Sequence, residues 1–286
     1  YLKKDLKSTI KDAVKFFGKK EIIVRTFDLA RREDDTMGNR GIRRCIGEGG
    51  HTIRLVAEVI KESLEEERGG YNLGVILPLV SHYSQIETAL DIFLDRGLTL
   101  KGENAQKKSQ IMYGWEIEQP AASQNNELWL EAFKARYGRP PDFIGIGTND
   151  LTQFTVALGR DAYANEDDLK VKNYLLSLYD ESDFSVVRQI YEVSKQCKEA
   201  GTRLFLLGQA ATKQEYTELM LSFDIIPSVD ISSVKGVKII ASKFEKRRNP
   251  KEEVVGEYVE NLCNKQYPSI KGYIKPKILE IFGVGH

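Results

Sequence analysis

The sequence predicts an α/β fold of the (βα)8, or TIM-barrel, type. Short apolar runs alternate with helical stripes of apolar residues, as in βα units built around a parallel sheet. This alternation alone fits a doubly wound sheet equally well. Polar residues after the predicted strands favour the barrel, whose active site forms where the C-terminal strand ends meet. These polar residues are Arg25, Asp28, Ser81, His82, Glu118, Asn149, Asp150, Gln209, Ser232 and Ser233.

The individual elements follow from hydrophobic spacing. Apolar residues that recur every three or four positions predict helices, as at 2–17, 55–64, 86–94, 187–194 and 216–223. Short apolar runs predict six strands, at residues 21–27, 73–80, 111–118, 143–146, 203–207 and 225–231. Residues 248–286 are predicted to form a C-terminal helical tail, interrupted by Pro250, Pro268 and Pro276. The barrel therefore spans residues 1–247.

The composition is that of a soluble globular protein, with 41% hydrophobic and 29% charged residues in 286 positions. Lys plus Arg and Asp plus Glu both number 42, and a net charge of zero argues against nucleic-acid or anionic-membrane partners. No apolar run approaches the roughly 20 residues of a membrane span, and lysines interrupt the N-terminal apolar stretches of a would-be signal peptide. Three scattered cysteines indicate a reducing compartment, so we expect a cytoplasmic protein.

One string stands out as specific, the run from Ile146 to Gln153 that contains Gly147-Thr148-Asn149-Asp150. With the upstream string Glu118-Gln119-Pro120-Ala121-Ala122, it resembles the barrel domain of the phosphoenolpyruvate-utilising enzymes. That family includes phosphoenolpyruvate synthase, pyruvate phosphate dikinase and enzyme I of the sugar phosphotransferase system. The resemblance covers about residues 21–245. It is closest to the synthase branch, because Leu207-Gly208-Gln209 falls where that branch has cysteine, glycine and glutamine.

The resemblance implies a set of site residues. The two Mg²⁺-binding carboxylates fall on Glu118 and Asp150, and the asparagine that contacts the substrate phosphate falls on Asn149. The remaining substrate-binding positions fall on Arg25, Arg40, Arg160 and Gln209. These residue types suit the chemistry, because Mg²⁺ takes hard oxygen ligands and arginine grips carboxylate and phosphate groups with two hydrogen bonds.

Structural roles remain open for the arginines. Arg25 and Arg40 are also placed to form ion pairs with Asp28 or Glu33, and Arg160 can equally be a solvated loop residue.

Two departures from the family pattern concern activity. The cysteine that moves a proton at the substrate's methyl carbon falls on Leu207, which has no titratable proton, so no catalytic residue is assigned. None of Cys45, Cys197 and Cys263 lies near a predicted strand end that would let it take over this role. The family barrel has eight strands, and this chain begins with what resembles the third, so the first two strands are expected to be missing.

The resemblance implies a phosphoenolpyruvate- or pyruvate-binding barrel of a synthase-like phosphotransferase that uses Mg²⁺. Phosphohistidine and ATP-binding domains are expected on the same longer polypeptide or on a partner chain, and a homodimer is a further possible assembly. Two alternatives stay open: a non-catalytic module that senses phosphoenolpyruvate or drives dimerisation, and a Mg²⁺-dependent lyase acting through a pyruvate enolate.

Overall fold

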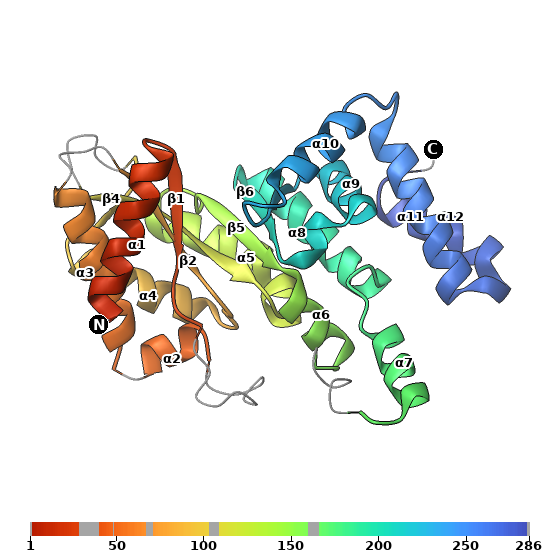
Figure 1. Cartoon of the computed structure of the whole chain (residues 1–286), viewed down its shortest axis with the longest axis horizontal. Helices are drawn as coiled ribbons and strands as arrows, with labels where there is room; N and C mark the ends of the chain where they lie inside the picture. Colours follow the sequence, from red (N-terminus) through yellow and green to blue (C-terminus); the bar gives the residue numbers. More distant parts are fainter. Residues whose placement is uncertain are drawn as a thin grey trace. The chain divides into compact units, whose positions relative to one another are not determined.

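The computed structural model describes residues 2–28, 40–47, 49–66, 71–102, 109–159 and 166–284. The chain divides into two compact units (Figure 1). The first unit comprises Tyr1–Ala122 and Leu128–Gly145, and the second comprises Ser123–Glu127 and Ile146–His286.

The first unit is built from alternating helices and strands. Its elements are α1 (Leu2–Phe17), β1 (Glu21–Arg25), α2 (Ile42–Gly47), α3 (His51–Glu66), β2 (Asn72–Leu77), α4 (Tyr83–Asp95), β3 (Thr99–Leu100), β4 (Gln110–Ile117), most of α5 (Pro120–Tyr137) and the start of β5 (Phe143–Gly147).

The strands of the first unit are parallel. β1 pairs with β2, β2 pairs with β4, and the short β3 adds to β4 at Thr99 and Leu100. Strands β2 and β4 are almost wholly buried, as expected for parallel strands covered by helices. The core of this unit contains an aromatic cluster, in which Tyr113 and Trp115 on β4 both pack against Phe133 of α5. The C-terminal end of β4 is therefore held against α5, and side chains that follow it are positioned by this packing.

The second unit carries the remaining elements. They are the end of β5, α6 (Thr148–Val156), α7 (Leu169–Leu178), α8 (Phe184–Ala200), β6 (Arg203–Leu207), the 3₁₀ helix η1 (Gln209–Thr212), α9 (Gln214–Ser222), β7 (Ile226–Ser228), α10 (Val234–Phe244), α11 (Pro250–Gln266), η2 (Pro268–Ile270) and α12 (Lys271–Ile281).

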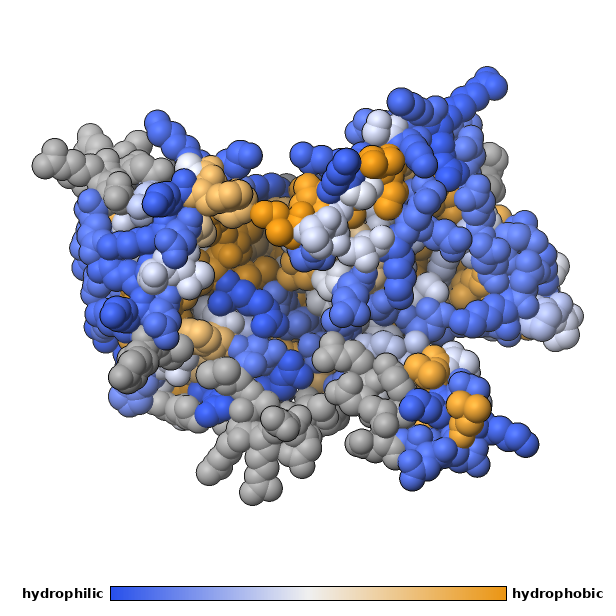
Figure 2. Space-filling model, viewed as in Figure 1, coloured by the Kyte–Doolittle hydropathy of each residue, from blue (hydrophilic) through white to orange (hydrophobic). Residues whose placement is uncertain are grey.

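The core of the second unit includes the end of the chain. Strands β6 and β7 pair in parallel, and the fully buried ring of Phe282 packs against Tyr191 and Phe223. Helix α7 differs from its neighbours because none of its residues is buried. Figure 2 shows apolar side chains on the surface of this helix.

The α/β prediction with parallel strands is confirmed. Each predicted strand coincides with one of β1, β2, β4, β5, β6 and β7, and the two-residue β3 is additional. Closure into an eight-stranded barrel and the domain boundary at residue 247 stay predictions. Within the described residues, no helix combines the length and apolar character needed to cross a membrane.

Candidate functional site

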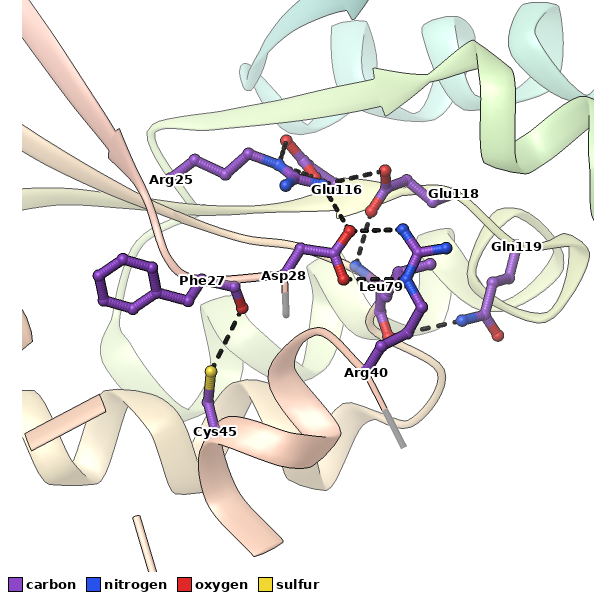
Figure 3. A network of polar contacts seen from close by, with 9 residues as sticks. All are labelled: Arg25, Phe27, Asp28, Arg40, Cys45, Leu79, Glu116, Glu118 and Gln119. Atoms are coloured by element: carbon purple, nitrogen blue, oxygen red, sulfur yellow. Dashed lines mark hydrogen bonds and ion pairs between the residues drawn. The ribbon is translucent and has the colours of Figure 1, made fainter. Parts of the chain in front are cut away.

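The first unit brings three predicted site residues into one charged network (Figure 3). The Arg25 guanidinium, at the end of β1, donates from Nη2 to Glu118 Oε1 at 3.3 Å, and lies 3.6 Å from Asp28 Oδ2. Arg40 holds the same aspartate with two hydrogen bonds, Nε to Oδ1 at 3.0 Å and Nη2 to Oδ2 at 2.5 Å. Arg25, Arg40 and Glu118, which lie far apart in the sequence, therefore meet at one place.

A buried carboxylate that the sequence analysis did not single out completes this network. Glu116 on β4 accepts from Arg25 Nε through both oxygens, at 2.9 and 2.8 Å, and its side chain is only 1% exposed. Glu116 and Glu118 are two residues apart, so a β-strand places both on the same face. This period-two spacing was the signal that could have identified Glu116 from the sequence.

The backbone after β2 holds Glu118 in place. The Leu79 N–H donates to Glu118 Oε2 at 2.7 Å, in a buried contact. Leu79 has a positive φ of 51°, a conformation that is uncommon for a non-glycine residue and is often kept at functional sites. The Gln119 side chain donates to the Leu79 carbonyl at 3.5 Å, which ties the strand end to the same loop.

The charges of the network explain its pKa shifts. Burial alone would raise the pKa of Asp28, but hydrogen bonds and charge from Arg40, with a smaller effect of Arg25, hold that pKa below its ordinary value. Burial would lower the pKa of Arg25, but Glu116 and Glu118 outweigh it and raise the pKa.

The second unit brings together the other described site residues. Asn149 and Asp150 lie in the first turn of α6, directly after β5, where the helix N-terminus stabilises negative charge. The Asn149 carbonyl accepts from the Tyr179 hydroxyl at 2.9 Å. Asp150 is half-buried at the same helix end.

The buried hydroxyl of Thr148 connects the end of β5 to the end of β6. Its oxygen lies 3.0 Å from Glu181 Oε1 and 3.3 Å from the carbonyl oxygen of Leu207. Leu207 is the last residue of β6 and is half-buried, and Gln209 is exposed at the start of η1. The strand ends that carry Asn149, Asp150, Leu207 and Gln209 are thus joined within the second unit.

Gly208 makes this junction possible. Its φ of 117° and ψ of 176° belong to a region that is essentially restricted to glycine. A Cβ at this position would lie 2.6 Å from Thr148 Oγ1. The backbone of β6 can therefore approach Thr148 only because residue 208 has no side chain.

Not every predicted position can be placed in the structure. Arg160 lies outside the described residues, and so does Glu33, the alternative partner of the arginines. The metal pair divides between the units, with Glu118 in the first and Asp150 in the second. The described part of the chain contains no cluster of three or more His, Cys, Asp and Glu side chains arranged to hold a metal ion.

One cysteine lies nearer a strand end than the sequence indicated. The Cys45 thiol on α2 is buried and donates to the carbonyl of Phe27, two residues after β1, at 3.3 Å (Figure 3). The helix α2 follows β1 closely in space, which strand prediction alone does not show.

Comparison with known proteins identifies the family. The family described as PEP-utilising enzyme, PEP-binding domain, matches residues 2–246. The chain belongs to this family. Its curated relatives in the family include a probable phosphoenolpyruvate synthase from Archaeoglobus fulgidus, 30% identical over 83% of this chain and 30% of the relative.

Two further relatives are also matched over less than half of their own length. The phosphoenolpyruvate synthase of Pyrococcus furiosus is 32% identical over 77% of this chain and 24% of its own length. The phosphoenolpyruvate-protein phosphotransferase of Listeria monocytogenes is 27% identical over 86% of this chain and 40% of its own length. This PEP-binding domain therefore spans less than half of each of these relatives. A citrate lyase structure from Burkholderia xenovorans is only weakly similar, with a TM-score of 0.40 and 11% identity over 79% of this chain and 67% of its own.

Proposed function

We propose that this chain is the phosphoenolpyruvate- or pyruvate-binding domain of a synthase-like phosphotransferase, in which a phosphoryl group passes between a phosphohistidine and pyruvate. The observation that carries the proposal is the meeting of Arg25, Arg40 and Glu118 in one network of the first unit. A chain of this family needs arginine guanidinium groups to bind an anionic substrate and a carboxylate to bind its metal ion. This network contains both kinds of group.

The two arginines would bind the substrate's acidic groups. The Arg25 Nε donates to both carboxylate oxygens of Glu116, at 2.9 and 2.8 Å. The contacts of its Nη2 with Glu118 and Asp28 are longer, at 3.3 and 3.6 Å. The side chain is also 41% exposed. An incoming carboxylate or phosphate would therefore replace the longer Nη2 contacts while Glu116 keeps the guanidinium in place. Arg160 and Gln209 remain proposed substrate contacts, as does Asn149 for the phosphate.

Glu118 and Asp150 would hold Mg²⁺. The donor set fits, because each supplies carboxylate oxygens, the ligands that Mg²⁺ prefers. Two carboxylates leave coordination positions for substrate oxygens and water. When bound, the ion supplies charge stabilisation for an enolate oxygen and the transferring phosphoryl group.

Leu207 supports a second candidate, a domain that binds the ligand without turning it over. By resemblance, the family's proton-carrying cysteine falls on this position, and the structure places the half-buried leucine at the end of β6. A leucine side chain cannot give or take a proton at the substrate's methyl carbon. We therefore propose that ligand binding is retained and enolisation is impaired. The lyase alternative has no observation of its own in its favour.

The wider assembly follows from the family. Phosphohistidine and ATP-binding domains would act with this domain, on the same longer polypeptide or on a partner chain, and a homodimer is compatible with the proposal. Cys45, Cys197 and Cys263 form no disulfide bonds, which suits a cytoplasmic location.

Calorimetric titration with oxalate, a mimic of enolpyruvate, and with phosphoenolpyruvate tests this function. We expect binding that requires Mg²⁺ and that is abolished by Glu118→Ala and by Asp150→Ala. Glu87→Ala is a matched control, since it also removes a carboxylate paired with an arginine, Arg136 at 2.6 Å. Unchanged binding in both site variants would refute the assignment.

A further inference from the structure

The buried carboxylate of Glu116 lies beside the Arg25 guanidinium in the charged network of the first unit (Figure 3). It accepts from Arg25 Nε through both oxygens, at 2.9 and 2.8 Å, and its side chain is 1% exposed. Among the described residues, Arg25 is the only partner of this carboxylate. A buried charge is costly unless it is paired, so the charges of Arg25 and Glu116 offset one another.

The carboxylate of Glu116 brings more to this contact than a hydrogen-bond acceptor. A neutral side-chain amide also has an oxygen that could accept from an arginine Nε–H. The carboxylate adds a negative charge, beside the guanidinium whose Nη2 would bind an anionic ligand. Because the Glu116 side chain is almost fully buried, water and salt screen this charge only weakly.

A ligand anion on Arg25 Nη2 would share one guanidinium with the carboxylate on Nε. Two groups bound to nitrogens of the same guanidinium lie within a Debye length of each other, about 8 Å at physiological ionic strength. Like charges at this range repel, and the repulsion grows with the charge of the ligand. The hydrogen bonds from Arg25 to Glu116 therefore favour ligand binding by orienting the guanidinium, whereas the charge of Glu116 opposes it.

We propose that Glu116 is a specificity-determining residue that makes the site discriminate against ligands of higher negative charge. This inference rests on the proposed function, because it takes Arg25 as an anion-binding residue. Phosphoenolpyruvate carries a carboxylate and a phosphate, whereas pyruvate carries one carboxylate. Glu116 therefore disfavours phosphoenolpyruvate more than pyruvate, and sets the relative affinity of the domain for the two.

Calorimetric titration of the whole chain with oxalate and oxamate, in the presence of Mg²⁺, tests the proposal. The two compounds have nearly the same shape, but oxalate carries two negative charges and oxamate carries one. Glu116→Gln removes the charge and keeps an oxygen that can accept from Arg25 Nε. We expect this variant to bind oxalate about tenfold more tightly than the wild type, and oxamate about threefold more tightly, because the repulsion is proportional to the charge of the ligand.

Glu87→Gln is the matched control, since Glu87 lies in the same unit and is paired with Arg136 at 2.6 Å. Its affinities should equal those of the wild type. Unchanged or weaker oxalate binding by Glu116→Gln, or equal strengthening of both ligands, would overturn the proposal and leave the proposed function intact. Absence of oxalate binding in the wild type and in both variants would refute the proposed function, and this inference with it.

A second pair of variants keeps the proposal testable if Glu116→Gln does not fold. Arg25→Gln removes the guanidinium and leaves the charge of Glu116 without this partner. Combining Arg25→Gln with Glu116→Gln replaces the ion pair by two neutral amides. We expect the double variant to bind oxalate about tenfold more tightly than Arg25→Gln alone, because the repelling charge is gone. Equal affinity of these two variants would contradict the role assigned to Glu116.

Discussion

The contacts of Arg25 could be predicted only in part from the sequence. The motif resemblance predicted a substrate contact, and an ion pair with Asp28 or Glu33 was the alternative. The ion pair is confirmed, at 3.6 Å, and the substrate contact stays a prediction. The strongest partner, Glu116, is 91 positions away. Such a contact depends on which strands lie near each other, and hydrophobic patterns along the chain do not specify this.

The lowered pKa of Asp28 predicts that its contribution to stability depends on pH. Its pKa is lower in the folded chain than its ordinary value of 3.8, because the guanidinium contacts outweigh burial. The stability it contributes is therefore complete above that ordinary value and is lost as the pH falls through the lowered folded pKa. We expect the difference in unfolding free energy between wild type and Asp28→Asn to be constant near neutral pH and to shrink below about pH 4, by at most about 1.4 kcal/mol per pH unit. Urea unfolding from about pH 6 to about pH 3 measures this difference, and a constant difference over the whole range would contradict it.

Helices and strands were predicted from the sequence where their burial leaves a pattern of apolar residues along the chain. The runs at β2 and β4 are mostly apolar, and almost all of their residues are buried, as in strands covered on both faces. Helix α7 buries no residue, and the sequence analysis did not predict it, although Val171, Tyr174, Leu175 and Leu178 recur at helical spacing. Strand β3 has two residues, too few to show any alternation.

The turn between β6 and η1 depends on the glycine conformation of Gly208. Gly208→Ala places a Cβ 2.6 Å from Thr148 Oγ1 and forces alanine into a glycine conformation. We expect a loss of stability of at least about 1–3 kcal/mol. Gly236→Ala is the control, since this residue of α10 has no atom within 4 Å of an added Cβ, and alanine should stabilise the helix by about 0.5–1 kcal/mol. Urea unfolding of both variants measures the contrast, and a similar effect of the two substitutions would show that the turn tolerates a side chain.

Across the whole chain, the candidate site residues were predicted from sequence motifs, whereas the hydrophobic pattern predicted the helices and strands. The family and the parallel α/β fold are established. Glu118 and Asp150 belong to different compact units, so the proposal that both are Mg²⁺ ligands rests on the motifs. The two additional strands of an eight-stranded barrel also rest on resemblance.

We propose that the anion site is retained, while the family's proton-carrying cysteine is replaced by Leu207. Loss of general acid–base assistance typically slows a reaction about 10²- to 10⁴-fold. Proton NMR of deuterium-labelled pyruvate with Mg²⁺ measures exchange at the methyl carbon directly. We expect very slow exchange by the wild-type chain and faster exchange by Leu207→Cys, with Leu207→Ala as the control for loss of the leucine side chain. Rapid exchange by the wild-type chain would contradict the claim and would indicate another proton carrier, for which Cys45, next to the Phe27 carbonyl, is the first residue to replace.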